Sequence, residues 1–375
     1  MARSAFDTFL GMKQRLRRSA WAKTFERSFL AMTRLATQTG SRALGKALKP
    51  VTAKRKRAGS STRTSLSTGT GTHPPDAGTW LPGVALGATG ARRFRLYRPP
   101  DLRAGERLPL LVMLHGCGQD ANSFATSTRM NRIALRERFW VLYPEQDRLV
   151  NGQGCWNWFD TKSGRAFGEA ALIMKAIDQV CLLHPVDSTR VAIAGLSAGA
   201  SMAALLVTRQ PGRFKAVVMH SGIPPGTAHS TLSALGAMRG RRATQPLAAT
   251  AALMAVDWPP LLVIHGEADT VVSPRNGRAA AQAWADAAGA SAGPERALQR
   301  GQRYPMRVTD FKRKGSTVAT LVAVHGLAHD WSGGAASKAF SDGKGPDASR
   351  MVWAFVAKQF RRCGVSNGLS CTNPS

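Results

Sequence analysis

Residues 191–207, VAIAGLSAGASMAALLV, constrain the fold most strongly because they change secondary structure within a single turn. The β-branched and apolar start is typical of a strand, whereas the alanine-rich end favours a helix. The glycines Gly195 and Gly199 supply clearance that a side chain would block, so a tight turn here would raise the Ser197 hydroxyl above the sheet edge. Small residues are also common in ordinary turns, so this motif needs support from the rest of the chain.

The chain alternates apolar strands with helices from about residue 92 to its closing helix. Near-continuous apolar strands separated by helices indicate an α/β fold, with a mostly parallel, doubly wound sheet covered by helices on both faces. Ligands bind such sheets at the carboxyl ends of the strands, where several polar residues fall here. Besides the strand and helix around Ser197, we expect strands at residues 92–99, 108–116, 139–146, 214–222 and 259–269, a strand ending at 319–326, and helices at residues 168–184, 275–289 and 347–362.

The positive charge is concentrated at the start of the chain. The 375 residues carry a net charge of +30, and residues 1–75 hold 16 Lys and Arg against 2 Asp and Glu. Residues 6–35 have the pattern of a basic amphipathic helix, and a Ser/Thr/Gly/Pro-rich linker follows from about Arg42 to Gly78. We therefore expect a basic arm over residues 1–78, a catalytic domain over 79–362 with an insertion near its active site at 223–257, and a C-terminal tail over 363–375.

An arm of this composition suits an anionic surface, and a solvated tail is the alternative interpretation. The apolar stripe of the expected helix consists of Trp21, Phe25, Phe29, Met32 and Leu35. Through residues 6–57 this segment could bind an anionic granule or membrane surface. Nucleic acid is a rival partner that would not need the aromatic stripe. The oligomeric state stays open.

If Ser197 is a nucleophile, it needs a base and a carboxylate that orients the base. In an α/β-hydrolase these residues follow the serine in the order acid and then histidine, each after a later strand. Asp269 directly follows the strand LLVIHGEAD, and its rivals are Glu267 and Asp257.

Two histidines remain downstream of the acid. His325 continues the strand ending at 319–326 and is expected to pack there. His329 lies in the loop GLAHDWSGG, from which an imidazole could reach Ser197, so we expect His329 to be the base.

Acyl transfer at Ser197 also needs donors for a developing oxyanion. We expect one from the backbone amide of Ala198 and the other from the amide of Cys117, since Gly116 and Gly118 let that loop turn inward. The pattern implies no metal and no organic cofactor.

Six motifs in this order carry a family resemblance: LHGCGQDANSFA, YPEQ, CWNWF, GLSAGASM, HGEADTVVSP and HDWSGG. They resemble the catalytic domain of short-chain polyhydroxyalkanoate (PHB) depolymerase family esterases of the α/β-hydrolase superfamily, over roughly residues 92–360. The resemblance implies the roles already expected of Ser197, Asp269 and His329, and an oxyanion loop at His115 to Gln119. Ala200 departs from the family, which commonly has glycine there.

The resemblance implies a serine esterase that hydrolyses poly(3-hydroxybutyrate) or its oligomers, so the expected partner is a polyester or small ester. A feruloyl or acetylxylan esterase is the alternative within this class, and a surface-binding protein with a vestigial hydrolase core is the alternative outside it. The candidate substrate contacts are Trp156, Trp158, Gln119 and Trp331. Of the two indoles in CWNWF, one is expected to pack in the core and one to meet substrate.

The cysteines and the N-terminus bear on the compartment. Five cysteines are too few and too scattered for a disulfide scaffold, and no CxxC pair suggests zinc. Cys117 and Cys155 fall in loops near the expected site, and whether they are bridged stays open. The first residues lack the pattern of a cleavable signal peptide, which favours a cytoplasmic, granule-associated protein over the extracellular location of many family members.

Overall fold

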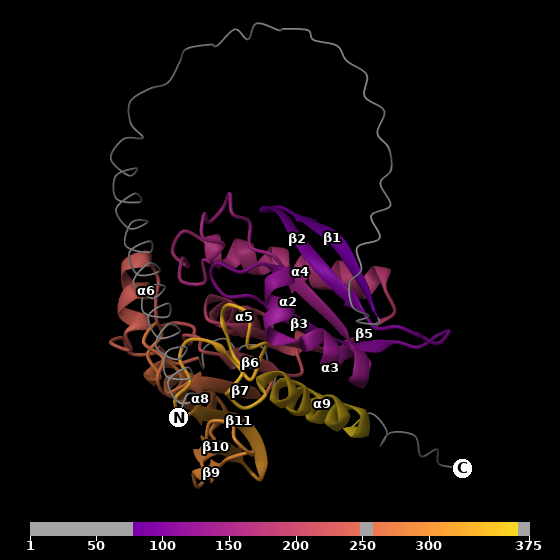
Figure 1. Cartoon of the computed structure of the whole chain (residues 1–375). Helices are drawn as coiled ribbons and strands as arrows, with labels where there is room; N and C mark the ends of the chain where they lie inside the picture. Colours follow the sequence, from indigo (N-terminus) through magenta and orange to yellow (C-terminus); the bar gives the residue numbers. More distant parts are fainter. Residues whose placement is uncertain (1–77, 248–257, 367–375) are drawn as a thin grey trace, which may run out of the picture. The chain divides into compact units, whose positions relative to one another are not determined.

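A computed structural model describes residues 78–247 and 258–366 (Figure 1). The expected amphipathic helix at 6–35, nearly all of the linker before Thr79, the carboxylate rival Asp257 and most of the C-terminal tail lie outside these residues. The proposed domain boundaries therefore remain predictions, although the first described strand does begin at Thr79.

A long mixed sheet forms the centre of the described residues. Its strands are ordered β1-β2-β4-β3-β5-β6-β7-β11-β10-β8, and β9 pairs with β10. The inner strands β4, β3, β5, β6, β7 and β11 are parallel, while antiparallel strands flank them at both edges. The strands are β1 (Thr79–Gly87), β2 (Gly90–Arg98), β3 (Leu108–Leu114), β4 (Trp140–Pro144), β5 (Val186–Leu196), β6 (Val217–His220), β7 (Leu261–Gly266), β8 (Ser291–Ala292), β9 (Arg296–Leu298), β10 (Met306–Arg313) and β11 (Ser316–Val324), with a separate parallel pair β12 (Trp331–Ser332) and β13 (Ser341–Asp342).

Helices cover both faces of this sheet, as Figure 1 shows. One face packs α2 (Ala121–Thr128), α3 (Met130–Glu137) and α9 (Ala348–Ser366), and the other packs α4 (Arg165–Leu183), α5 (Ala198–Arg209) and α8 (Arg275–Ala288). Because both faces are covered, β3 (LPLLVML) and β7 (LLVIHG) are buried along their whole length. The expected mostly parallel, doubly wound arrangement is confirmed.

Several elements differ from the sequence expectation. The expected strand at 214–222 is only four residues long as β6, and α9 runs to Ser366, beyond the expected end at 362. The expected insertion at 223–257 contains α6 (Thr231–Met238), whose first turn is capped by Ser230. Strands β1 and β10 and helices α2 and α3 were not expected. A short 3-10 helix, η1 (Pro211–Arg213), precedes β6.

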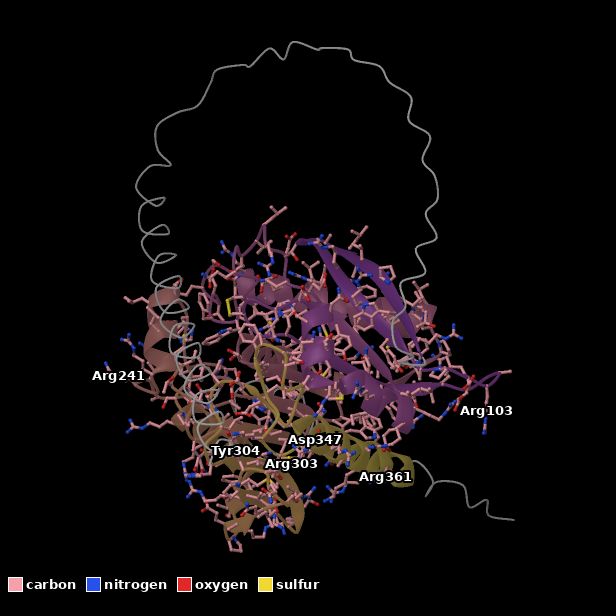
Figure 2. The ribbon with its side chains drawn as sticks, viewed as in Figure 1. Arg103, Arg241, Arg303, Tyr304, Asp347 and Arg361 are labelled. Atoms are coloured by element: carbon pink, nitrogen blue, oxygen red, sulfur yellow. A yellow bond between two sulfur atoms is a disulfide. The ribbon has the colours of Figure 1, made fainter. Side chains whose placement is uncertain are left out.

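The carboxyl ends of the central strands lie at one edge of the sheet. Ser197 follows β5 directly, Asp269 follows β7, and His329 follows β11. The fold therefore brings three segments that are distant in sequence to the same edge. Arg103, Arg241 and Arg361, which Figure 2 labels, are among the exposed arginines of the described residues. Among the described helices, none combines the length and apolarity needed to cross a bilayer.

Candidate active site

Ser197 occupies a strained turn between β5 and α5. Its backbone has φ 55° and ψ −120°, a conformation that residues other than glycine rarely adopt. A Cβ at Gly195 would overlap the backbone of Gly199, and a Cβ at Gly199 would overlap the carbonyl of Leu114. Both glycines are therefore required by close backbone approach, as the sequence predicted.

Ala200, where the family commonly has glycine, packs without strain of its own. The methyl group of Ala200 is fully buried and faces Gly222, where an added Cβ would come within 2.7 Å of it. The methyl group of Ala200 therefore fits because Gly222, which faces it, has no side chain.

The structure brings Ser197, His329 and Asp269 together in one hydrogen-bonded chain. His329 Nε2 lies 2.8 Å from Ser197 Oγ, and His329 Nδ1 lies 2.7 Å from Asp269 Oδ2. Asp269 Oδ1 accepts hydrogen bonds from the amides of Val271 and Val272 at 2.9 and 2.8 Å. With its other oxygen fixed by two amides, the carboxylate can hold the tautomer in which Nδ1–H of His329 donates to Asp269 and Nε2 accepts from Ser197.

The electrostatics of this chain favour an ionised carboxylate. Burial raises the pKa of Asp269, but attraction to His329 and hydrogen bonds from His265 and His329 together lower it below its ordinary value. Burial lowers the pKa of His329, but attraction to Asp269 and the hydrogen bond between them raise it above its ordinary value. The two shifts agree, because each group stabilises the charged form of the other.

Two further histidines that the sequence analysis did not single out support the site. His265, on β7, is buried, with Nε2 3.0 Å from the Val272 carbonyl and 3.4 Å from Asp269 Oδ2. His220, at the end of β6, stacks on Trp331 and accepts a hydrogen bond at Nε2 from the amide of Ser332. Burial lowers the pKa of His220 to about 3, so this imidazole is neutral near pH 7. Their signal in the sequence is position, since both lie near the carboxyl end of a central strand.

Glu267 and His325, the rival acid and the rival base, lie beside each other and outside the hydrogen-bonded triad of Ser197, His329 and Asp269. His325 is exposed, and its Nδ1 lies 3.2 Å from Glu267 Oε2. Glu267 also pairs with Arg307. The expectation that His325 packs within the strand was wrong, because β11 ends at Val324 and the next side chain turns toward solvent and this carboxylate.

The amides expected as oxyanion donors belong to Cys117, in the loop after β3, and to Ala198, at the start of α5. In the loop after β3, the Gly116 amide donates to Gln119 Oε1, the Gly118 amide to the Gln153 carbonyl, and the Gln119 amide to the Gly116 carbonyl. Within the described residues, the Cys117 amide has no protein acceptor. The Ala198 amide opens α5, where helical geometry leaves the first amides without an intrahelical acceptor. The oxyanion roles of Cys117 and Ala198 remain proposals.

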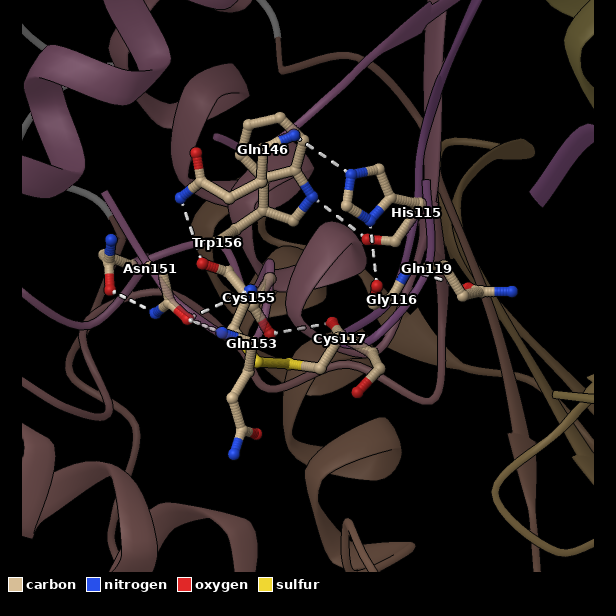
Figure 3. Close-up of a disulfide and its surroundings, with 12 residues drawn as sticks. His115, Gly116, Cys117, Gln119, Gln146, Asn151, Gln153, Cys155 and Trp156 are labelled. Atoms are coloured by element: carbon tan, nitrogen blue, oxygen red, sulfur yellow. Dashed lines mark hydrogen bonds between the residues drawn. A yellow bond between two sulfur atoms is a disulfide. The ribbon is translucent and has the colours of Figure 1, made fainter. Parts of the chain in front are cut away.

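A disulfide joins the loop after β3 to the loop that follows β4 (Figure 3). It links Cys117 to Cys155, with 4.3 Å between their Cα atoms, and so resolves a question that the sequence left open. Beside it, Trp156 Nε1 donates to the His115 carbonyl at 3.0 Å, and the Gln146 amide donates to His115 Nε2 at 3.1 Å. His115 is therefore a loop-shaping residue, and burial lowers its pKa to about 4.

The buried carboxylate of Glu169 holds the loop that follows β4. Glu169 on α4 accepts hydrogen bonds from Gln146 Nε2 at 2.7 Å and from the amide of Asn157 at 2.9 Å. Arg92 donates to Gln146 Oε1, and its guanidinium lies over the ring of Trp156. The segment bearing CWNWF is thus held by several buried polar contacts.

These contacts correct part of the expected substrate surface. Trp156 and Trp331 have no exposed area, and the indole nitrogen of each is hydrogen-bonded, to the His115 carbonyl and to Ser349 respectively. Gln119 is buried and caps the Gly116 amide. Trp156, Trp331 and Gln119 therefore support the loops of the site and have almost no exposed surface with which to contact a substrate. Trp158, which retains 8% exposure, stays the candidate contact from CWNWF. In the described segments, no three His, Cys, Asp or Glu side chains cluster as ligands for a metal.

Comparisons with known proteins show that this chain is similar to esterases. A family profile described as Esterase PHB depolymerase matches residues 92–298. Poly(3-hydroxyalkanoate) depolymerase C of Paucimonas lemoignei is 32% identical over 175 residues, which cover 45% of this chain and 42% of that protein. Feruloyl esterase B of Thermothelomyces thermophilus is 27% identical over 52% of this chain and 69% of its own length.

A solved structure supports the fold. An acetyl xylan esterase from Aspergillus awamori superposes with a TM-score of 0.57 at 19% identity, covering 74% of this chain and all of that one. The fold is that of the α/β-hydrolases. The match to the depolymerase spans less than half of that relative's length.

Proposed function

The chain belongs to the Esterase PHB depolymerase family, and from this premise we propose that it is a serine esterase that hydrolyses poly(3-hydroxybutyrate) or its oligomers. The observation that carries the reaction type is the chain of hydrogen bonds from Ser197 through His329 to Asp269. The 2.8 Å between Ser197 Oγ and His329 Nε2 lies within the reach needed for proton transfer to a positioned base, and the 2.7 Å contact with Asp269 Oδ2 orients that base.

In the first half of the reaction, Ser197 Oγ attacks the ester carbonyl carbon while its proton passes to His329 Nε2. The carbonyl oxygen becomes an oxyanion that accepts hydrogen bonds from the amides of Cys117 and Ala198. The tetrahedral intermediate then collapses, the bond to the alcohol oxygen breaks, and His329 returns the proton to that alcohol. Asp269 stays ionised and stabilises the imidazolium throughout.

In the second half, water replaces the alcohol. His329 takes a proton from this water as it attacks the acyl carbon on Ser197, and the same two amides bind the oxyanion. Collapse breaks the acyl bond, and the proton returns from His329 to Ser197 Oγ. The products are an alcohol and a carboxylic acid, and no cofactor is consumed.

The polyester substrate is supported by the likeness to the depolymerase and by the apolar ring of Trp158. Trp158 packs edge-on against Phe159 at 5.5 Å, in a segment fixed by the disulfide at Cys155. Its remaining exposed surface can meet an aliphatic chain. Because feruloyl and acetylxylan esterases are also among the relatives, esters of ferulate and acetylated xylan are the competing substrates.

A side-by-side comparison of specificity constants tests this substrate proposal. Purified protein should release 3-hydroxybutyrate from amorphous polyester or its oligomers faster than ferulate or acetate from esterified xylan. Trp158→Ala should raise KM for oligomers and leave KM for a short nitrophenyl ester within about twofold. Faster turnover of xylan esters would overturn the polyester substrate but leave the catalytic mechanism intact. If the purified wild-type protein hydrolyses none of these esters, both the polyester substrate and the catalytic mechanism are overturned.

A further inference from the structure

Arginine side chains surround a cavity of about 390 Å³ between α3, α9 and the segment before β10. The cavity lies within the described residues and does not include Ser197, His329 or Asp269. A single carboxylate, that of Asp347, lines it. The arginines come from three separate elements and are Arg129, Arg132, Arg136, Arg300, Arg303 and Arg350. Figure 2 labels Arg303 and Asp347, which lie on the same side of the molecule.

Two of these guanidinium groups are held in place by backbone carbonyls. Arg129 donates to the carbonyl of Gly333, in the segment that follows His329. Arg303 Nη1 donates to the carbonyl of Gly345 at 2.6 Å and to that of Gly343. A guanidinium has five N–H donors, so these bonds leave further donors of Arg129 and Arg303 available. A backbone carbonyl carries no net charge, so the positive charge of each arginine is not neutralised.

Of the other four arginines, two have a carboxylate partner. Arg350 pairs with Asp347 at 3.4 Å, and Arg136 pairs with Glu137, which does not line the cavity. In the described parts of the chain, Arg132 and Arg300 have no side-chain hydrogen bond and no ion pair. Positive charge therefore exceeds negative charge around this cavity.

A second cavity shows that this imbalance is a local property. A cavity of about 1060 Å³ near the starts of β3 and β5 also has a basic lining. There, Arg138 pairs with Glu106 at 2.6 Å, and Arg190 pairs with Asp187 at 2.6 Å. The arginine cavity beside α3 has no comparable set of acidic partners.

We propose that the arginine cavity binds a phosphate group carried by a small molecule or a lipid headgroup. Guanidinium groups donate paired N–H bonds that match phosphate oxygens, and groups arriving from several directions suit a tetrahedral anion better than a planar one. A phosphate carries nearly two negative charges near pH 7, which compensates more of this lining than one carboxylate would. Buried Ile133 and Met306 add apolar surface, so the cavity also accommodates the organic part of a phosphate ester.

Calorimetric titration of the full chain with inorganic pyrophosphate tests this site at near-physiological salt. The pair Arg132→Ala and Arg300→Ala removes the two unpartnered arginines, both exposed, without cutting any contact seen in the structure. The control pair Arg93→Ala and Arg241→Ala removes the same charge from exposed positions outside the cavity. The cavity pair should weaken pyrophosphate binding by at least about tenfold, and the control pair should change it by less than about twofold.

The control pair is needed because residues 1–75 also attract anions. Equal weakening by the two pairs, or no weakening by the cavity pair, would overturn the proposal. Ser197→Ala should bind pyrophosphate like the wild type, so failure of the esterase mechanism would not affect this test.

Two further probes distinguish the source of the phosphate. Glycerol 3-phosphate represents a soluble ester, and phosphatidic acid in phosphatidylcholine vesicles represents a headgroup. Cavity-dependent binding of either one supports the site and identifies its source. If the cavity pair changes the binding of neither probe, the cavity takes neither a soluble phosphate ester nor a lipid headgroup, and the proposal is overturned.

Discussion

Replacing Asp269 by asparagine should disable the base without enlarging or emptying its site. In the wild type, Asp269 Oδ1 accepts hydrogen bonds from the amides of Val271 and Val272, and the carbonyl oxygen of the asparagine can keep both. Its NH2 group then faces His329 Nδ1, 2.7 Å away in the wild type, and can only donate. The imidazole is forced to carry its proton on Nε2, which donates to Ser197 Oγ instead of accepting from it.

The expected loss follows from removing base function while the binding and oxyanion contacts remain. We expect kcat to fall by about 10³- to 10⁴-fold, or roughly 4–5.5 kcal/mol of transition-state stabilisation. Hydrolysis of a short nitrophenyl ester, followed from pH 5 to 9, provides the assay. A decrease of less than about tenfold would refute the assigned role of Asp269.

The pH profile gives an independent check on the same variant. In the wild type, kcat/KM should fall as pH drops through the pKa of His329, because the imidazolium cannot accept a proton. Burial lowers the pKa of His329, and the charge of Asp269 and its hydrogen bond raise it above the ordinary value. Without that charge, burial is opposed only by the smaller attraction to Asp330, so the pKa of His329 should fall and the residual activity of the variant should persist to lower pH. A shift toward higher pH would contradict this account.

Glu267→Gln provides the matched control. Glu267 has the same carboxylate chemistry two residues away but pairs with Arg307 and His325 at the surface. Its replacement should change kcat by less than about twofold. A loss as large as that of the Asp269 variant would show that the acid has been misassigned.

Two further outcomes are expected. His329→Ala should lower kcat by at least about 10³-fold and His325→Ala by less than about twofold in the same ester assay, and the reverse ranking would exclude His329 as the base. The paired replacement Cys117→Ser and Cys155→Ser opens a bridge spanning 38 residues, so urea unfolding should show a free energy of unfolding lower by roughly 4 kcal/mol. The same pair should lower kcat more than it raises KM, because the Cys117 amide is a proposed oxyanion donor; unchanged stability and kcat would contradict the role of the bridge.

The disulfide also bears on the compartment. Disulfides form and persist in oxidising compartments. A bridge between Cys117 and Cys155 would persist in an oxidising compartment, so the cytoplasmic location stays a prediction that the redox state of these two cysteines can test. Thiol titration of the native protein isolated from its own cells, with and without denaturant, would show which state the bridge has there.

The sequence predicted the centre of this fold because buried parallel strands have an unambiguous pattern. Strands β3 and β7 are buried along their whole length and β5 is buried from Val191 onward, and Ser197 and Asp269 follow the carboxyl ends of β5 and β7. Strand β1 was missed because Pro82 and Gly83 are typical of a linker. Both are tolerated there because β1 is an edge strand, and the place of a side chain at Gly83 is taken by the ring of Phe94.

The supporting residues of the site could not be predicted in the same way. His265 and His220 act through contacts with neighbouring strands and loops, and local sequence patterns do not report such contacts. Trp156 and Trp158 share one motif, and which indole is buried depends on the carbonyl of His115, about 40 residues earlier in the chain. Aromatic character alone could not separate a packing role from a substrate contact.

The central claim is that Ser197 is the nucleophile activated by His329, and covalent labelling tests it most directly. The protein should react with a nitrophenyl organophosphate to give a stable adduct at one site, which peptide mass spectrometry locates. Our account predicts that the adduct forms on Ser197 in proportion to the loss of ester hydrolysis, and that His329→Ala slows labelling by at least about 10³-fold. An adduct on another residue such as Ser201, or full labelling without loss of activity, would contradict it.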